Sequence, residues 1–345
     1  MFDSQRPIEE RRPAPSEATI LSWLERVARV SDERLAGPSL DRELSELLST
    51  YADFVRVSKA RRRVTAAADG IAFFISVAQA EGLAIDDDLL DVASAFELYG
   101  LSLTLFDAVG DDELEPPFSL LPPAVVTNAA LVLFLLGTSG LSAAASGSPA
   151  GASIRSIFLE QSLVAGSAQH CDLVGRRATC LTDALDQARG KTSLHAMVAE
   201  VAARLAGATE ARAVSYRRMG QAAATMRQIG NDLRDLFAVQ TSGDLRLRRQ
   251  TVPIAIHRLE ADADARRALD ELLAEDPPSE ERVRACLLAS GAVLRAAELM
   301  EKSRREIHRI ARELDVATGP LAPFLGFVDG LAAKLYRRGG VGSAS

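Results

Sequence analysis

Apolar residues recur along most of the chain at intervals of three and four, which is the spacing of an amphipathic helix. The pattern first appears at Ile20, Trp23, Leu24 and Val27. Alternation of the strand type is not sustained anywhere. We therefore predict an all-α protein with a single large domain of about a dozen helices over residues 17–338. The polar, proline-bearing residues 1–16 and the glycine-rich residues 339–345 are expected to be flexible tails.

Breaks in the helical pattern fall where glycine and proline gather, because these residues end helices or form turns. They occur at Gly82, at Pro116–Pro117, around residues 147–152, at Gly190, at residues 241–243 and at residues 276–278. Neither a GxGxxG pattern nor a P-loop is present, and no repeat period stands out.

Composition and charge narrow the function classes. The chain is 48% hydrophobic and 25% charged with a formal charge of −7, so nothing attracts it generally to nucleic acid. We expect no nucleic-acid partner, and an anionic ligand would need local basic residues or metal ions. Three cysteines without a CxxC spacing favour a reducing compartment and make a zinc site improbable. The first residues lack the apolar segment of a secretory signal, so we predict a cytoplasmic location.

Residues 116–154 carry no charge, which raises the question of a membrane. A spanning helix needs about 20 consecutive apolar residues. Here Pro122, Pro123, Asn128 and Gly137 interrupt the run. We therefore predict a buried central helix near residues 129–136 and no membrane span.

Two acidic clusters lie within otherwise apolar helical patterns. In the first, Asp107 and Asp111 are four residues apart and share a helix face, with Asp112 next to them. In the second, Asn231 and Asp235 have the same spacing, and Asp232 lies between them. Carboxylates stacked on one face repel each other unless a cation joins them, and hard oxygen ligands suit Mg²⁺. The alternative is that these residues cap a helix or face solvent.

The order of motifs points to a family. Gln228-Ile-Gly-Asn231-Asp232-Leu-Arg-Asp235 is followed by Asp244-Leu-Arg-Leu-Arg-Arg249-Gln-Thr251-Val-Pro253. This stretch resembles the second aspartate-rich region of the trans-polyprenyl diphosphate synthases. Gly190-Lys191-Thr192 is similar to the family's Lys-Thr pair, and the helix from Gly166 through Gln169 to Asp172 resembles another family segment. The segment from Glu97 to Asp112 falls where the first aspartate-rich helix belongs.

The resemblance implies an all-α isoprenoid-synthase fold around a central apolar cavity, a homodimer, and Mg²⁺ ions that bind an allylic prenyl diphosphate. By position, the metal ligands would be Asp107, Asp111, Asp112, Asn231, Asp232 and Asp235. The diphosphate would be held by Lys59, Arg62, Lys191, Thr192, Gln228 and Arg249. Asp107, Asp111, Asp232 and Lys191 would be the catalytic residues. The cavity floor would involve Leu101, Leu103 and Phe106. The alternatives are that Lys191 only begins a helix and that Arg249 belongs to a solvated basic run.

The chain departs from the family pattern at several positions. Ala108 stands where the first motif has its second aspartate, and Asn231 begins the second motif in place of an aspartate. Gly100 replaces a histidine. The paired arginines expected after the first motif are missing, because the chain continues Glu113-Leu-Glu-Pro-Pro-Phe. The histidine and the arginines help to hold the two diphosphates in the family, so their loss concerns isopentenyl diphosphate in particular.

Three functions remain open at this point. The family default is prenyl transfer to isopentenyl diphosphate. The second is a terpene-synthase-like lyase or cyclase that ionises the allylic substrate without isopentenyl diphosphate, which the missing basic residues favour. The third is a non-catalytic subunit of a prenyl synthase. The retained second motif with Lys191 and Arg249 argues against the third.

Overall fold

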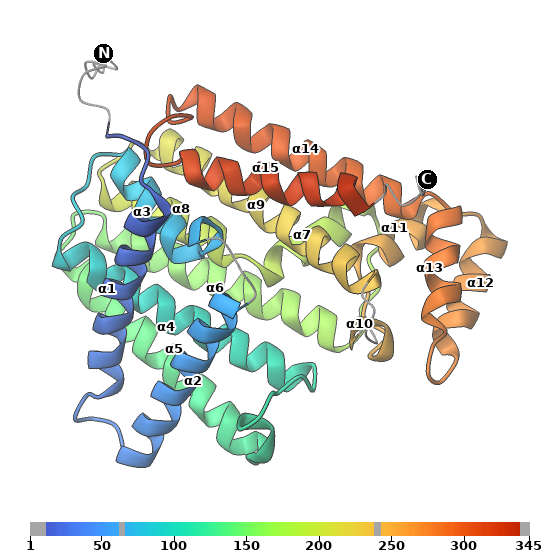
Figure 1. Cartoon of the computed structure of the whole chain (residues 1–345), viewed down its shortest axis with the longest axis horizontal. Helices are drawn as coiled ribbons and strands as arrows, with labels where there is room; N and C mark the ends of the chain where they lie inside the picture. The colour runs from blue at the N-terminus through green and yellow to red at the C-terminus, as the bar shows by residue number, and fades with distance from the viewer. Residues whose placement is uncertain (1–11, 62–65, 238–242, 339–345) are drawn as a thin grey trace, which may run out of the picture.

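The computed structural model describes residues 12–61, 66–237 and 243–338, and every regular element in these ranges is a helix (Figure 1). The all-α prediction is confirmed. The α-helices are α1 (Glu17–Leu35), α2 (Arg42–Arg61), α3 (Gly70–Ala80), α4 (Asp87–Gly110), α5 (Pro123–Ser146), α6 (Gly151–Leu173), α7 (Leu181–Lys191), α8 (Leu194–Leu205), α9 (Glu210–Leu236), α10 (Gly243–Arg246), α11 (Val252–Glu260), α12 (Ala263–Ala274), α13 (Glu280–Ala289), α14 (Ala292–Glu313) and α15 (Ala322–Arg338). Two short 3₁₀ helices, η2 (Ala66–Ala68) and η3 (Phe118–Leu120), lie between them.

The start of the first helix follows from its capping residue. The Oγ atom of Ser16 accepts a hydrogen bond from the backbone N–H of Thr19, which satisfies one of the free donors of the first turn. Just before it, the guanidinium of Arg12 donates to the backbone carbonyls of Gly82 and Leu83. Residues 12–16 of the predicted tail are therefore attached to the turn after α3. Residues 1–11 and 339–345 of the predicted tails lie outside the described residues.

The long helices form two packed groups around α4. In the larger group, α8 packs on α9 and α3, while α14 lies along α9 beside α15 (Figure 1). In the smaller group, apolar residues of α2, α4 and α5 form a second core. The α4 helix is buried toward both groups, which explains why apolar residues occupy nearly its whole circumference. The α12 and α13 helices form a small hairpin at one end of the molecule.

The predicted break at Gly190 is wrong, since α7 continues through this residue to Lys191. A Cβ atom at position 190 would lie 2.4 Å from the Cβ atom of Ala168 on α6. Glycine is therefore needed for the close approach of α7 to α6, and not for a turn. This close contact brings Lys191 to the end of α6.

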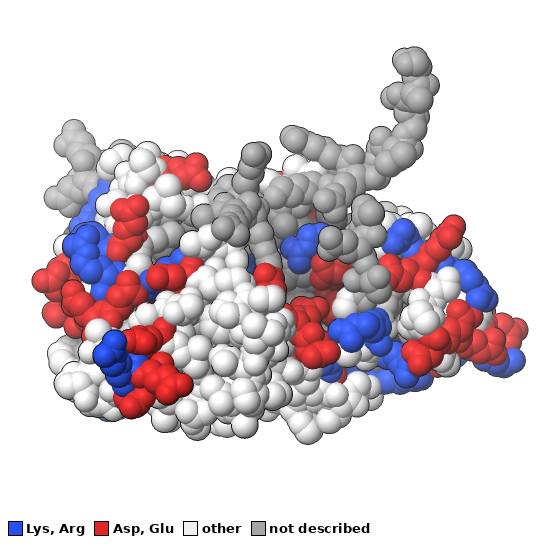
Figure 2. Space-filling view, turned by 60° about the horizontal axis from the view of Figure 1, so that its bottom comes forward, with Lys and Arg blue, Asp and Glu red and all other residues white. Residues whose placement is uncertain are grey.

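The uncharged segment forms α5, which is buried on one face only. Ala129, Ala130 and Leu133 are buried, whereas Leu131 and Leu135 are about half exposed. The prediction of a buried central helix near residues 129–136 is therefore correct for the inner face and wrong for the outer face. By length and composition alone, α4 and α5 are long and apolar enough to cross a membrane. Core helices of soluble proteins share these two properties. Figure 2, which brings the bottom of the Figure 1 view forward, shows a broad surface without charged side chains.

Candidate active site

The first acidic cluster lies at the C-terminal end of α4. Asp107 belongs to the last turn, and Asp111 follows the helix, with its backbone N–H donating to the carbonyl of Asp107 at 2.9 Å. Asp112 adopts a positive φ of 55° and its side chain is 89% exposed. Its carboxylate lies 4.0 Å from the guanidinium of Arg246. The turn at Asp112 thus separates its side chain from Asp107 and Asp111, the other two predicted metal ligands of the first cluster.

Asp111 is paired with Arg249 from the loop before α11. The Nη2 atom of Arg249 donates to Oδ1 of Asp111 at 2.5 Å and to the carbonyl of Gly110 at 3.0 Å. Its Nη1 atom donates to the carbonyl of Asp172 at 2.7 Å. Arg249 is only 7% exposed, so the alternative of a solvated basic run is wrong. The guanidinium instead joins the ends of α4 and α6.

Lys191 lies next to this group at the end of α7. Its ammonium is 2.9 Å from Oδ2 of Asp172, and both side chains are mostly buried. Although burial opposes the charged form, the carboxylates of Asp172 and Asp107 raise the pKa of Lys191. The alternative that Lys191 only begins a helix is wrong, because it ends one. The neighbouring Thr192 donates through Oγ1 to the carbonyl of Ala224 at 3.1 Å, which ties this turn to α9.

The second acidic cluster lies near the end of α9, with Asp232 at its centre. Oδ1 of Asp232 accepts from Nε2 of Gln228 at 2.7 Å, and Oδ2 accepts from the backbone N–H of Val252 at 2.7 Å. Val252 is the first residue of α11, so Asp232 satisfies a free donor of that helix. Asp232 is 3% exposed, and burial raises its pKa to about 6.

The other two residues of the second cluster are more open. Asn231 is half-buried. The side chain of Asp235 is 38% exposed, and Oδ1 of Asp235 accepts from Nε of Arg234 at 3.1 Å. These positions leave Asp235 accessible to a ligand at the end of α9.

A small polar pocket of about 30 Å³ lies among these groups. Its lining residues are Ala168, Asp172, Ala184, Gln187, Ala188, Lys191, Gln228, Asp232, Asp244, Arg249, Gln250, Thr251, Val252 and Ala255. The pocket thus brings carboxylates of α6, α9 and α10 together with the cationic groups of Lys191 and Arg249.

Two site residues were missed in the sequence, Asp172 and Asp244. Asp172 is three residues after Gln169 and pairs with Lys191, while Asp244 lines the pocket from α10. Burial and the charge of Asp232 raise the pKa of Asp244 to about 7. Both residues lie in segments that resemble the family, so the sequence indicated that they could belong to the site. Only the tertiary packing shows that they face Lys191.

The donor set has the chemistry that Mg²⁺ prefers. Burial, and to a smaller extent the nearby charge of Asp111, raise the pKa of Asp107 against the opposing effect of Lys191, so a cation at this carboxylate would favour its charged form. Within the described ranges, no three Asp, Glu, His or Cys side chains lie close enough to hold a metal ion by themselves. Mg²⁺ usually keeps several waters and takes other ligands from substrate phosphate. The carboxylates therefore fit a cation that is held together with a diphosphate.

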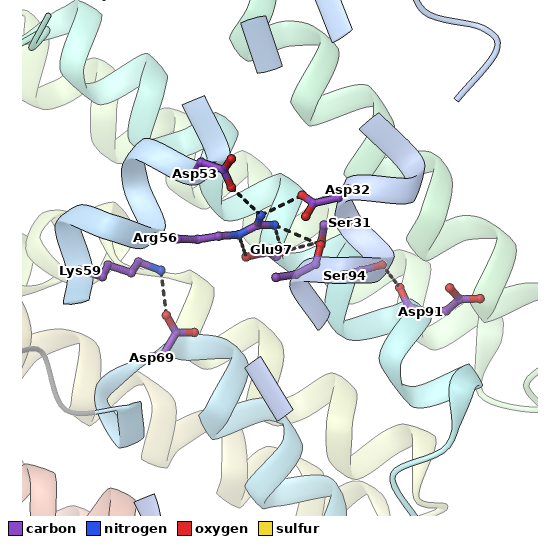
Figure 3. A network of polar contacts seen from close by, with 10 residues as sticks. Ser31, Asp32, Asp53, Arg56, Lys59, Asp69, Asp91, Ser94 and Glu97 are labelled. Carbon is purple, nitrogen blue, oxygen red and sulfur yellow. Dashed lines mark hydrogen bonds and ion pairs between the residues drawn. The ribbon is translucent and has the colours of Figure 1, made fainter. Parts of the chain in front are cut away.

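Lys59, one of the predicted diphosphate-binding residues, lies apart from the pocket. The ammonium of Lys59 is 2.7 Å from Oδ2 of Asp69 (Figure 3). The other carboxylate oxygen of Asp69, Oδ1, accepts from the backbone N–H of Ile71 at the start of α3. Arg62 lies outside the described residues. Beside this pair, Arg56 donates to both carboxylate oxygens of Glu97 at 3.1 Å. This network holds α2 against α4, and neither Lys59 nor Asp69 lines the polar pocket.

The residues expected at a cavity floor face different cores. Leu103 packs against the larger core, whereas Leu101 and Phe106 belong to the smaller core of α2, α4 and α5. An apolar cavity of about 10 Å³ in that smaller core is lined by Leu48, Leu105 and their neighbours.

Comparisons with known proteins agree on the fold. Neither a protein-family model nor a curated protein sequence matches the chain. Among solved structures, a geranylgeranyl pyrophosphate synthase from Corynebacterium glutamicum, complexed with calcium and isoprenyl diphosphate, superposes with a TM-score of 0.73 at 18% identity, covering 92% of this chain and 96% of that chain. A polyprenyl synthetase from Streptomyces coelicolor A3(2) gives 0.70 at 20% identity, covering 92% and 99%. A decaprenyl diphosphate synthase from Rhodobacter capsulatus gives 0.71 at 17% identity, covering 92% and 97%. The resemblance inferred from the motifs is thus confirmed in three dimensions, and the chain has the all-α fold of the trans-polyprenyl diphosphate synthases.

Proposed function

We propose that the chain is a Mg²⁺-dependent class I isoprenoid enzyme that binds the diphosphate of an allylic prenyl substrate and ionises its C–O bond. One observation carries this proposal: Asp232 of the second cluster lines one polar pocket together with Lys191 and Arg249, and Arg249 is also paired with Asp111 of the first cluster. Burial raises the pKa values of Asp107 and Asp232, and a bound cation would stabilise their charged forms.

The charge and hydrogen bonds of each site residue suggest its role in binding and ionisation of the substrate. Mg²⁺, when bound, would neutralise negative charge that develops on the leaving diphosphate. Lys191 would donate to the diphosphate oxygens and release its present partner Asp172. Gln228 would keep Asp232 oriented toward the pocket. The packed apolar core beneath would exclude water from the reacting carbon.

Prenyl transfer is the reaction that the names of the matching structures state, and it is our first candidate for the overall outcome. It requires a second diphosphate, that of isopentenyl diphosphate. Two diphosphates repel each other strongly unless basic groups lie between them.

A specific observation favours the second candidate, a lyase or cyclase that acts without isopentenyl diphosphate. At Gly100, where the family pattern has a histidine, a Cβ atom would lie 3.3 Å from Cδ2 of Leu194. An apolar side chain thus occupies the space beside that position. After α4, burial and the charges of Asp111 and Asp107 raise the pKa of Glu113, so an acid faces the cluster where the family pattern has arginines. Both features disfavour the binding of a second diphosphate, that of isopentenyl diphosphate.

Product analysis distinguishes the candidates. The purified chain would be incubated with Mg²⁺ and C10, C15 or C20 allylic diphosphates, with and without isopentenyl diphosphate. Prenyl transfer predicts longer diphosphates only when isopentenyl diphosphate is present. The lyase predicts hydrocarbons or alcohols in its absence. Lack of turnover with every substrate would favour the non-catalytic subunit.

A homodimer is also proposed, through the outer faces of α5 and α6. Leu131 and Leu135 on α5 and Leu159 and Leu163 on α6 are between 47% and 72% exposed. Apolar patches of this kind mark interaction surfaces. The α5 helix carries no charged residue, so its outer face can meet a second copy of itself without burying an unpaired charge. A soluble, cytoplasmic enzyme without a membrane span remains our prediction.

A further inference from the structure

One short loop connects the two acidic clusters. At its start, Arg249 contacts Asp111 after α4 and Asp172 on α6. At its end, the backbone N–H of Val252 donates to Asp232 on α9. Only two residues separate these anchor points. The loop from Arg249 to Val252 therefore fixes how far apart the two clusters lie.

The contacts of Arg249 are mainly structural. Its two carbonyl acceptors, Gly110 and Asp172, belong to the last turns of α4 and α6, where carbonyl groups lack partners within the helix. A positive charge at these two helix ends also interacts favourably with both helix dipoles. The Nε atom is buried without a hydrogen bond and lies 3.7 Å from Oδ2 of Asp172.

A lysine could not make this set of contacts. The guanidinium is a planar fork with five donors, whereas an ammonium is a compact point charge. Only the fork can donate at once to the carbonyls of two helices and to the carboxylate of Asp111. A lysine at this position would therefore lose some of the bonds that the arginine makes.

We propose that Arg249 is a positioning residue that sets Asp111 for Mg²⁺, and does not itself grip the substrate diphosphate. This inference rests on the proposed function. Before the metal arrives, Arg249 supplies the counter-charge of Asp111 and joins the ends of α4 and α6. It thereby holds the first cluster at a fixed distance from Asp232. Arg249 acts on the metal through Asp111.

The test uses Arg249→Lys, with calorimetry of Mg²⁺ binding in the presence of inorganic diphosphate and thermal unfolding without either. Loss of a group that orients a metal ligand typically costs tenfold or more in metal affinity. We expect the Mg²⁺ concentration for half-saturation to rise about tenfold. The unfolding temperature of the ligand-free protein should fall by about 3–6 °C, because the bonds to both helix ends are lost.

Two further variants separate positioning from mere stability. Arg258→Lys removes a comparable arginine fork, because Nη2 of Arg258 donates to Oδ1 of Asp270 at 2.7 Å. This pair is separate from the two acidic clusters. It should lower the unfolding temperature and leave Mg²⁺ binding unchanged. In an Asp111→Asn background, Arg249→Lys should have no further effect on Mg²⁺ half-saturation. This non-additivity is expected only if Arg249 acts through Asp111.

The outcomes are distinct. Unchanged Mg²⁺ binding in Arg249→Lys would overturn the inference, since a substrate grip tolerates lysine. A further tenfold loss in the Asp111→Asn background would overturn it as well. If the unaltered chain shows no Mg²⁺-dependent binding of inorganic diphosphate, the proposed function fails and the inference fails with it. Circular dichroism confirms that each variant is folded, and Asp111→Asn, which keeps the carbonyl bonds of Arg249, provides the comparison if Arg249→Lys does not fold.

Discussion

The ammonium of Lys191 lies 2.9 Å from Oδ2 of Asp172, and 18% and 11% of these two side chains are exposed. The pair joins the end of α7 to the end of α6 at the wall of the polar pocket. A mostly buried ion pair of this kind is costly to break on one side only, because the remaining charge loses its partner. Lys191 therefore has a structural role in addition to its proposed contact with the diphosphate.

The two roles of Lys191 can be separated with a second substitution. Lys191→Gln should lower the free energy of unfolding by about 1–3 kcal/mol, because Asp172 is left without its counter-charge. Adding Asp172→Asn should restore most of this stability, yet turnover should stay at least about tenfold below the original. Urea unfolding and product assays measure the two effects. Recovery of turnover together with stability would show that Lys191 does not contact the substrate.

The pH dependence of stability should reveal the buried carboxylate of Asp244, whose pKa is raised from 3.8 to about 7. The folded state binds more protons than the unfolded state between these values, so stability contributed by this group falls as pH rises from about 4 to 7. Asp244→Asn should therefore stabilise the metal-free protein at pH 8 by about 1–2 kcal/mol. At pH 3.5 it should have little effect, since Asp244 is then protonated in both states. Urea unfolding in chelator at both pH values checks this, and an equal effect at both would contradict it.

Leu194 beside Gly100 gives a test of the missing second anion site. A histidine at position 100 must displace Leu194, because even its Cβ atom would lie 3.3 Å from Cδ2. Gly100→His should lower the free energy of unfolding by about 1–3 kcal/mol through overpacking. Adding Leu194→Ala should relieve much of this loss. If Gly100→His is as stable as the original chain in urea unfolding, Leu194 does not fill the space.

Helical spacing predicted that Asp107 and Asp111 share one helix face, and the structure has Asp107 in the last turn of α4 with Asp111 directly after that helix. Spacing could not predict that Asp112 leaves the helix with a positive φ. The burial of Arg249 depends on two helix ends that are far apart in the sequence, and so does its choice of partners. The same holds for Leu194, whose contact with Gly100 arises from the packing of α8 near α4.

The exposed leucines of α5 and α6 predict a concentration-dependent dimer. Leu135→Glu combined with Leu163→Glu should shift the chain to a monomer, since each would bury a charge in the interface. Leu294→Glu is a matched control, because Leu294 on α14 is 66% exposed away from these helices. Sedimentation velocity measures the mass. A monomeric original chain, or a dimer that survives the double substitution, would contradict this interface.

The most direct test of the account is the release of diphosphate from C10, C15 and C20 allylic diphosphates without isopentenyl diphosphate. We expect release that requires Mg²⁺, stops in chelator and is lost in Asp111→Ala and in Asp232→Ala, since these residues represent the two clusters. Asp186→Ala, on the exposed face of α7, serves as the control that retains activity. Release that persists in both cluster variants, or no release from any of the three substrates, would contradict the central claim.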